Sequence, residues 1–544
     1  MKKRYLNSIL SKIWASLILL MIFSSGCNKD FFSKQPLDAV SDGTFWKTAA
    51  DAQLALVGCY ATTYNAGTQD FFSYRGLLFL DFIAGEGNDK ANVTEGINSG
   101  NVNSADANIL SYWQNAYSKV ATCNNFLDHI GQINMDATTK ATMIAEVRSI
   151  RAYVLFNVAL YWGDVPMPEH LLTVSQANSI TQTKQADVWA FAESELQAAS
   201  AALPLTRPTA EAGRWTAGAA LAILGRVQMA EKKWSDAAAT YKKIIDSNVY
   251  SIDPHYAEMF WQEYNNKSPE VILATQYLTD LYAISLPLYY FPVAWGGWHQ
   301  FAPFNNLVRD FGCKDGLPIT QSPLFDPNHP YNNRDPRMDY NFFISNRTIF
   351  QGKLYVAEPG SGSPDEFSIY PQWTGYGVMK YCDPNFTGNL RNYGGNTIVI
   401  RYAEVLLGYL ESQLEAGVAI NQTLLDQTIN KVRGRTAVNL PKVTTIDQTA
   451  LRTIVRTERK VELAFEGLRL YDILRWGIAY DELNTTFTGL WLTNDPAHYV
   501  KYKVDNQGFY IYGKKVFVKG INERWPIPIS EINVNKNLKQ NPGY

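Results

Sequence analysis

The sequence predicts a mainly α-helical protein, in which a divergent tetratricopeptide-like helical-repeat scaffold is overlaid by an irregular, loop-rich region with short strands. Two observations predict this class. Apolar residues recur at the spacing of one helix face, with Ala52, Leu56 and Tyr60 at steps of four and residues 451–468 at steps of three, four and seven. Over residues 251–396 this periodicity is lost, and Pro, Gly, Asn and aromatic residues dominate. That composition favours turns, short strands and short helices laid over the scaffold.

The composition bounds the size and the partners of the chain. Its 544 residues exceed the usual length of one domain several-fold. A net charge of −2 creates no field over the whole molecule, so nothing points to nucleic acid as a partner. The aromatic content is high, at 13% with 14 Trp and 32 Tyr. Because Trp and Tyr make flat, amphipathic contacts when they lie at a surface, this excess hints at a binding face.

The N-terminus has the pattern of a secretory signal peptide over residues 1–26. A positively charged start is followed by an apolar run, residues 13–23, and by three small residues. The run is shorter than the ~20 residues that a membrane span needs. Cys27 follows directly and resembles a lipobox cysteine, although Ser24 stands where many lipoboxes carry Leu. We expect lipidation of Cys27 and an anchor in the outer membrane; the alternative is an ordinary signal with an incidental cysteine.

Helical segments fill most of the N-terminal half. A long one, residues 139–162, stops at Gly163, with Pro166 just beyond. By contrast, residues 65–107 are rich in Gly, Asn, Asp and Ser and keep no lasting period, so we expect a long loop there. The expected helical segments are residues 48–64, 108–130, 139–162, 184–202 and 215–248.

Residues 215–248 keep the offsets of a tetratricopeptide repeat. Gly225 and Ala237 are twelve residues apart, and Tyr241 follows four residues later. The small residues let two helices cross closely, with Tyr241 filling the groove between them. One such helix pair cannot bury its own face, so further helices are implied. Residues 401–415, which contain a second Leu-Gly pair, are one candidate.

The irregular middle holds a cluster of aromatic residues. Its most distinctive segment is Trp295-Gly296-Gly297-Trp298, in which the glycines leave both indoles sterically open. A sugar ring has an apolar C–H face that suits a flat aromatic ring. Its hydroxyls then need polar partners, because unpaired buried polar groups are costly. The alternative is that these aromatic residues form a satellite core beneath the loops.

Residues 452–477 combine a helical apolar period with many charges. Arg459–Glu462 and Arg469–Asp472 are each three residues apart, so each pair can meet on one side of a helix. We interpret the stretch as two amphipathic helices with solvated ion pairs, bent near Gly467.

Two further expectations concern local structure near the C-terminal half. Asp335 and Arg337 are expected to form a turn and an ion pair. Residues 480–520 alternate polar and aromatic side chains, which predicts a small β-hairpin region.

No metal is assigned from the sequence. The six His residues lack ligand spacing, and the Asp-rich residues 315–343 lack the calcium-loop pattern, which leaves calcium unassigned. No C-x-x-C pair occurs, and wide spacings do not decide whether the later cysteines form disulfides. We expect Cys59 and Cys123, which sit in helical patterns, to be buried thiols. The four later cysteines are Cys59, Cys123, Cys313 and Cys382.

Six ordered segments carry family-like motifs. The clearest are EVRSIRAYVLFNVALYWGDVPM at residues 146–167, TERKVELAFEGLRLYDILRWG at 457–477 and ERWPIPISEINVNKNLKQNPGY at 523–544. The other three lie at residues 27–46, 315–343 and 429–438. Together they resemble the SusD/RagB family, the nutrient-binding surface lipoproteins of Bacteroidetes.

The resemblance implies an organisation and a function. The signal peptide would be followed by a SusD-like N-terminal helical region, residues 27–250, and by a RagB/SusD C-terminal region, residues 251–544. The chain would be a cell-surface lipoprotein that captures oligosaccharides and delivers them to a SusC-like TonB-dependent transporter in the outer membrane. The family is not enzymatic, and the resemblance implies no cofactor.

Three other functions stay open. Some relatives in the family bind peptides rather than glycans. A surface glycoside hydrolase needs only two carboxyl groups at a suitable separation in space, and a sequence does not exclude such a pair. A purely structural helical-repeat adaptor would bind only protein. Sugar binding without product release favours the binding protein over the enzyme and the adaptor.

The resemblance also places the ligand site by region. Family sites use the loop after the first helix and the aromatic middle, here residues 74–103 and 289–300. We expect aromatic side chains to stack on sugar rings and polar side chains to bind hydroxyls. The expected stacking residues are Trp295 and Trp298, with Tyr289 as a flank, and the expected hydroxyl partners are Asn88, Asp89 and His299.

Overall fold

The structure is a computed structural model that describes residues 14, 45–61, 69–90, 102–370, 373–492 and 501–544. The predicted signal peptide, apart from Trp14, and Cys27 lie outside these ranges. In the described part of the chain, no helix is both long and apolar enough to cross a membrane. The longer helices are α2 (Ala49–Tyr60), α3 (Tyr74–Ile83), α5 (Ala107–His129), α6 (Ala137–Trp162), α8 (Gln185–Ala202), α9 (Ala217–Ala230), α10 (Trp234–Asp246), α14 (Tyr402–Glu415) and α17 (Gln448–Glu462).

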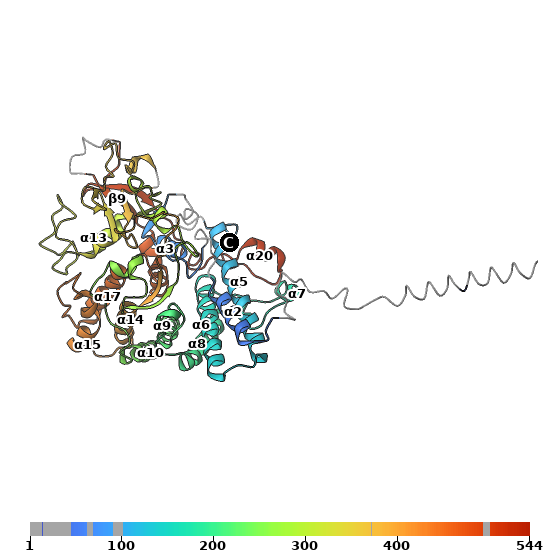
Figure 1. Cartoon of the computed structure of the whole chain (residues 1–544). Coiled ribbons are helices and arrows are strands. Elements are labelled where there is room, and N and C mark those ends of the chain that lie inside the picture. The colour runs from blue at the N-terminus through green and yellow to red at the C-terminus, as the bar shows by residue number, and fades with distance from the viewer. Residues whose placement is uncertain (1–13, 15–44, 62–68, 91–101, 371–372, 493–500) are drawn as a thin grey trace, which may run out of the picture.

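Most of the longer helices form a curved row along the base of the molecule in Figure 1. Helix α8 packs against α6 and α9, α10 packs against α9 and α14, and α17 continues the row from α14. Helices α2 and α5 close its other end against α6. A row of this kind buries helix faces that no single pair can bury. The mainly α-helical prediction is confirmed.

The expected tetratricopeptide-like contact is present at Tyr241. A Cβ atom added to Gly225 would lie 2.4 Å from the Tyr241 ring, so only glycine lets α9 and α10 approach this closely. Gly408 of α14, from the second Leu-Gly pair, meets the same ring, with an added Cβ 2.9 Å away. The Tyr241 ring is therefore held between two glycine-bearing helices.

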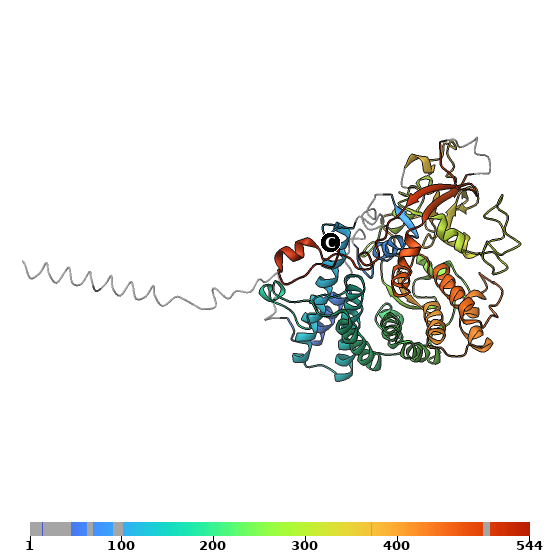
Figure 2. The same cartoon turned by 180° about the vertical axis from the view of Figure 1, so that it is seen from behind.

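Short elements overlie the helical row. In the described part the strands form five separate two-stranded antiparallel sheets, which lie with α13 and several loops above the row in Figure 2. The pairs are β1 (Gly87–Asp89) with β3 (Phe301–Pro303), β2 (Val271–Thr275) with β8 (Thr397–Arg401), β4 (Phe342–Ile344) with β7 (Tyr376–Val378), β5 (Ile349–Phe350) with β6 (Lys353–Leu354), and β9 (Thr486–Trp491) with β10 (Phe509–Lys514). The last pair is the expected hairpin region.

The short helices serve as connections between these layers. Asp335 and Arg337, at the start of α13, form the expected ion pair at 2.7 Å, and both side chains are buried. The short helices are α7 (Val174–Ala177), α11 (Leu286–Tyr290), α12 (Asn305–Asp310), α13 (Arg337–Asn341), α15 (Gln422–Gln427), α16 (Ile429–Arg433), α18 (Arg469–Arg475), α19 (Ala479–Leu483) and α20 (Ile529–Val534).

Helix α3 corrects the expectation of a long loop over residues 65–107. Ser73 caps it by accepting a hydrogen bond from the Gly76 N–H at 3.0 Å, and every residue of the helix except Arg75 is buried. A helix buried on nearly all sides is apolar all round, so its sequence has no amphipathic period. For this reason, the spacing of apolar residues does not predict α3 from the sequence.

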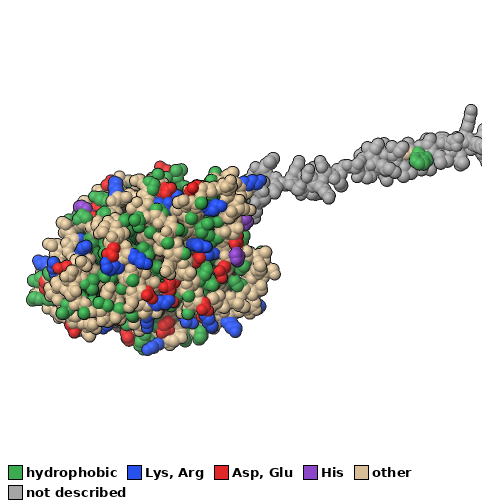
Figure 3. Space-filling view, turned by 90° about the horizontal axis from the view of Figure 1, so that it is seen from below, with side chains coloured by type: hydrophobic (Ala, Val, Ile, Leu, Met, Phe, Trp, Pro, Cys, Tyr) green, Lys and Arg blue, Asp and Glu red, His purple; other side chains and the backbone are tan. Residues whose placement is uncertain are grey.

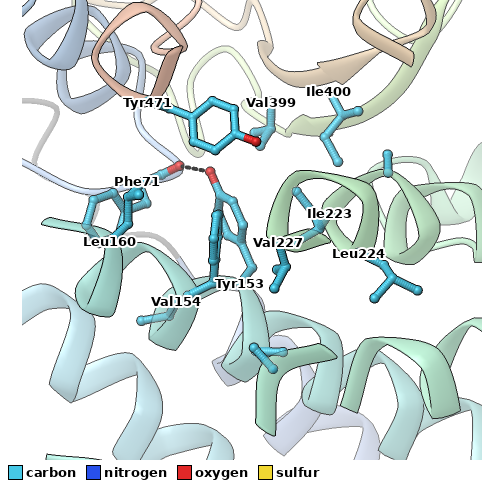
Figure 4. Packing of buried hydrophobic residues seen from close by; sticks show 14 of the residues in the cluster. Phe71, Tyr153, Val154, Leu160, Ile223, Leu224, Val227, Val399, Ile400 and Tyr471 are labelled. Carbon is cyan, nitrogen blue, oxygen red and sulfur yellow. Dashed lines mark hydrogen bonds between the residues drawn. The ribbon is translucent and has the colours of Figure 1, made fainter. Parts of the chain in front are cut away.

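The main core joins the helical row to segments from far along the chain. Figure 4 shows the Tyr153 hydroxyl donating to the Phe71 carbonyl oxygen, at 3.0 Å, among buried side chains of α6, α9 and β8. Tyr471 of α18 lies against the same cluster, and its hydroxyl donates to the Arg226 carbonyl oxygen. All four cysteines in the described residues are buried free thiols, as expected for Cys59 and Cys123.

Residues 452–477 form α17 and α18 with a break around Gly467, but their ion pairs are not solvated, and that interpretation is wrong. Glu462 is fully buried and accepts hydrogen bonds from three guanidinium groups. Burial alone would raise the pKa of Glu462, yet these cations lower it well below its usual range. The three cations are Arg435, Arg401 and Arg337, which come from three different segments.

The two ion pairs expected within these helices are also wrong. Arg459 pairs with Asp472 at 2.9 Å, and Arg469 pairs with Glu482 at 2.7 Å. The expected pair within α17 fails because that helix packs against α14 and α12, so its charged side chains meet partners on other elements. Buried charges need such partners because leaving one unpaired is costly.

Candidate functional site

Pairing between β1 and β3 brings together the two segments expected to hold the ligand. Asn88 lies opposite Ala302, and Asp89 lies opposite Phe301. The contact continues beyond the strands, where the Lys90 N–H donates to the Gln300 carbonyl oxygen at 2.8 Å. Residues more than two hundred positions apart in the chain therefore form one surface.

The segment after α11 folds back on itself. The Trp298 N–H donates to the Leu288 carbonyl oxygen at 2.6 Å, and the Gln300 N–H donates to that of Tyr289 at 2.8 Å. A Cβ at Gly297 would lie only 2.0 Å from the Phe291 carbonyl oxygen, so this close return requires glycine. The glycines thus set the return of the chain and the position of Trp298.

Two of the expected aromatic residues become neighbours through this return. The rings of Tyr289 and Trp298 have centroids 5.2 Å apart and planes at 82°. Trp298 is 41% exposed, which leaves part of its ring open to a ligand. Tyr289 is half-buried beside it. This edge-to-face arrangement is a favourable aromatic geometry and fixes both ring planes.

Trp295 has a different environment from Trp298. Its ring is half-buried against Phe343 and Phe350, with centroid distances of 6.3 and 5.9 Å. Its indole N–H donates to the Phe350 carbonyl oxygen at 3.1 Å. Trp295 therefore contributes to local packing as well as offering a partly open ring.

The three expected hydroxyl partners lie beneath this surface. Asn88 and Asp89 are buried; the Asn88 amide donates to the Tyr512 hydroxyl, and Asp89 accepts from the Gln300 amide. His299 is 1% exposed, and its Nδ1 lies 2.9 Å from an Asp365 carboxylate oxygen.

Asp365 also organises the neighbouring loop. Its carboxylate accepts from the Val293 and Ala294 N–H groups at 2.7 and 2.9 Å. His299 Nε2 is buried and has no hydrogen-bond partner among the described residues. The structure thus places His299 and Asp365 where they position the loop that carries the aromatic residues.

Three cations that sequence reasoning missed surround the aromatic residues. Arg75 lies 5.2 Å from the centre of the Tyr289 ring, and Arg391 lies 5.3 Å from that of Trp298. Lys90 lies 3.6 Å from the centre of the Tyr370 ring and donates to the Trp298 carbonyl oxygen at 3.3 Å. Only the fold brings these cations together, so no spacing in the sequence could have found them.

We call this patch the aromatic surface and define it by Tyr289, Trp298, Tyr370, Arg75, Lys90 and Arg391. It offers flat rings for apolar contact and N–H donors for oxygen atoms. Among the described residues, no group of three or more His, Cys, Asp or Glu side chains could hold a metal ion. The rings and N–H donors of the aromatic surface suit recognition by stacking and hydrogen bonding.

Two cavities lie elsewhere in the described part of the molecule. One, of about 480 Å³, is largely apolar and is lined by Leu56, Tyr60 and Trp215 among others. The other, of about 580 Å³, is polar and is lined by Arg309, Arg456 and neighbouring residues. Neither is lined by any of the six residues expected from the sequence.

Comparison with known proteins identifies the family. Residues 257–544 match the SusD family, and residues 50–229 match a family described as starch-binding and associating with the outer membrane. A SusD-like carbohydrate-binding protein from Bacteroides fragilis has a solved structure similar to this one. The two share 35% sequence identity and a TM-score of 0.86, over 91% of this chain and 100% of that one. The chain belongs to the SusD family.

More distant relatives share the length and the fold. The SusD-like protein P25 of Formosa agariphila is 24% identical, over 97% of this chain and 98% of that protein. A laminarin-binding SusD-like protein of known structure is 22% identical, with a TM-score of 0.67 over 92% of this chain and 100% of that one. The second likeness concerns the fold alone.

Proposed function

We propose that this protein is a cell-surface glycan-binding protein that captures oligosaccharides at the aromatic surface. The observation that carries the proposal is the exposed Trp298 ring, fixed edge-to-face against Tyr289 and surrounded by side-chain N–H donors. The printed descriptions of the family and of the Bacteroides fragilis relative, which name starch and carbohydrate binding, support it. Aromatic stacking on the apolar face of a sugar leaves the sugar hydroxyls to polar groups.

The wider role rests on the family. We propose lipidation at Cys27, an outer-membrane anchor, and delivery of the captured glycan to a SusC-like TonB-dependent transporter, with no catalysis by this chain. The buried, hydrogen-bonded state of Asp89 and Asp365 supports a binding role, because neither carboxylate faces a ligand as an acid or a nucleophile would. Cys27→Ser should release the protein from the outer membrane and leave glycan affinity in solution unchanged.

Calorimetry on the soluble 28–544 fragment, with a panel of oligosaccharides, tests the binding function. We expect Trp298→Ala to weaken binding at least tenfold with little loss of stability, since its ring is 41% exposed. Trp295→Ala should reduce both affinity and stability, because this ring also packs against Phe350. Tyr480→Ala, at an equally exposed aromatic residue on α19, is the matched control and should bind normally.

The same mixtures distinguish the other functions. Thin-layer analysis that finds intact ligand supports capture, whereas product release would establish a glycoside hydrolase. Binding of peptides and of no glycan would identify a peptide-binding member of the family. Co-purification of a transporter without any small ligand would favour the adaptor. Unchanged glycan affinity in Trp298→Ala would remove the aromatic surface as the site.

A further inference from the structure

The aromatic surface carries an unbalanced positive charge. Arg75, Lys90 and Arg391 each lie over one of its rings. Asp89 is the carboxylate beside them, 3.7 Å from Arg75, and it already accepts from the Gln300 amide. Because Asp89 is buried, it offsets the charge of Arg75 from within the protein.

Lys90 and Arg391 are the two cations open to a ligand. Among the described residues, no carboxylate lies within ion-pairing distance of either of them. Asp280, on a neighbouring loop, accepts a hydrogen bond from the Asn392 amide at 2.5 Å. The face in Figure 3 mixes acidic and basic side chains and the net charge is only −2, so the protein as a whole has no charge that would attract an anion.

Stacking on a ring holds a cation in place but does not neutralise it. The ring attracts the cation through its quadrupole, and the full positive charge remains available to an anion. Arg391 lies over one face of the Trp298 ring, so a sugar can stack on the opposite face and reach Arg391 past the edge of the ring. An acidic group on that sugar would then meet the guanidinium, which binds carboxylate and sulfate oxygens in a bidentate manner.

We infer that the ligand of this protein is an anionic oligosaccharide, whose ring stacks on Trp298 while its carboxylate or sulfate group binds Arg391 and Lys90. The inference rests on the proposed glycan-binding function and specifies its substrate class. Uronic acids and sulfate esters present the same chemistry, namely charged oxygen atoms next to an apolar sugar face. A neutral glycan would leave both cations without an anionic partner.

Matched ligand pairs test the inference by calorimetry. De-esterified oligogalacturonides are compared with their fully methyl-esterified forms, and sulfated carrageenan oligosaccharides with their desulfated forms. Neutral laminarin and malto-oligosaccharides complete the panel. We expect at least one charged form to bind tenfold or more tightly than its neutral partner in 50 mM NaCl, with the advantage shrinking in 500 mM NaCl because salt screens exposed charges. The pair that shows the effect identifies the charged group.

Substitutions test whether Arg391 and Lys90 cause the preference for the charged ligand. Arg391→Gln and Lys90→Met should each reduce affinity for the charged form about tenfold and leave affinity for its neutral partner nearly unchanged. Lys536→Gln, an exposed lysine beyond α20, is the control and should keep the preference. Arg391 and Lys536 are exposed and Lys90 is half-buried, so we expect little change in thermal midpoint, and unchanged midpoints would show that folding is not the cause.

Three results would overturn the inference, wholly or in part, in distinguishable ways. Equal affinity for charged and neutral partners, with binding still lost in Trp298→Ala, would refute the anionic ligand and leave glycan capture standing. Absence of binding across every charged and neutral glycan in the panel would refute both. A charge preference that survives Arg391→Gln and Lys90→Met together would refute the assignment of these cations.

Discussion

At the scale of single residues, burial decides what a charge costs and which partners it needs. Glu462 is ionised in the interior because three guanidinium groups surround it. Lys515 is the opposite case. It is buried between Phe304 and Phe487, and it donates a hydrogen bond to the Phe82 carbonyl oxygen at 3.1 Å. No carboxylate among the described residues pairs with it, and burial lowers the pKa of Lys515 to about 7.

This lowered pKa predicts how stability changes with pH. An unfolded lysine has a pKa of about 10.4, so between pH 10 and pH 7 the unfolded chain binds a proton that folded Lys515 does not. The wild-type protein therefore loses stability from this group as the pH falls through that range, by up to about 1.4 kcal/mol per unit. The Lys515→Met variant has no amine at this position and so does not show this loss. Its free energy of unfolding, relative to that of the wild type, should therefore rise as the pH falls from 10 to 7.

Urea unfolding of both proteins at several pH values measures this difference. Lys536→Met, which removes an exposed lysine, controls for the loss of one positive charge. A difference between Lys515→Met and wild type that stays constant from pH 10 to pH 7 would contradict the buried amine.

At the scale of elements, close helix crossings depend on the absence of a side chain. The Tyr241 ring of α10 lies against Gly225 of α9 and Gly408 of α14, and a Cβ on either glycine would overlap it. Gly58 of α2 is different, because nothing lies within 4 Å of where its Cβ would be. Replacing glycine by alanine should therefore change the free energy of unfolding in opposite directions at these two kinds of site.

Gly225→Ala should destabilise the protein by about 1–3 kcal/mol, because the Tyr241 ring must move in a packed interior. Gly58→Ala should stabilise it by about 0.5–1 kcal/mol, since alanine is the better helix former and meets no obstacle. Chemical denaturation of both variants measures the two values. A neutral or stabilising Gly225→Ala would mean that α9 and α10 do not cross as closely as described.

At the scale of the whole molecule, the C-terminal segment packs against the helices of the N-terminal half. Trp525 stacks on Tyr161 of α6, with ring centroids 4.8 Å apart and planes at 15°. The Trp162 indole donates to the Pro526 carbonyl oxygen at 2.9 Å, and the Asn541 amide donates to the Trp162 carbonyl oxygen at 2.7 Å. In Figure 1 the C-terminus lies beside α5, so the last segment completes the core of the first helices.

Trp525→Ala should cost about 3–5 kcal/mol in the free energy of unfolding, as expected for removal of a large buried aromatic side chain. The loss should appear as a lower unfolding midpoint for the whole protein. Trp298→Ala removes the same side chain from an exposed position and should cost less than about 1 kcal/mol. Similar losses in the two variants would show that the C-terminal segment is not part of the core.

Much of the secondary structure could be read from the sequence because its cause is local. Helix α6 starts at a capping Asp136 and ends at Gly163, whose φ of 80° suits glycine, and both signals are visible along the chain. The spacing between Gly225 and Tyr241, which predicts the packing of α9 against α10, is also visible along the chain. Helix α3 was missed for a physical reason: its burial on nearly all sides removes the period that reveals a helix.

The sequence by itself determined the helical scaffold and the family, because repeat offsets, caps and shared motifs are local patterns; the two segments of the candidate site, which the resemblance places, stay a prediction. The tertiary structure alone decided which side chains meet. Pairing of β1 with β3 buries Asn88 and Asp89 and exposes Trp298 beside Tyr289. Folding also turned the charges of α17 inward and set Lys90 and Arg391 at the aromatic rings, because these contacts join segments that no spacing along the chain relates.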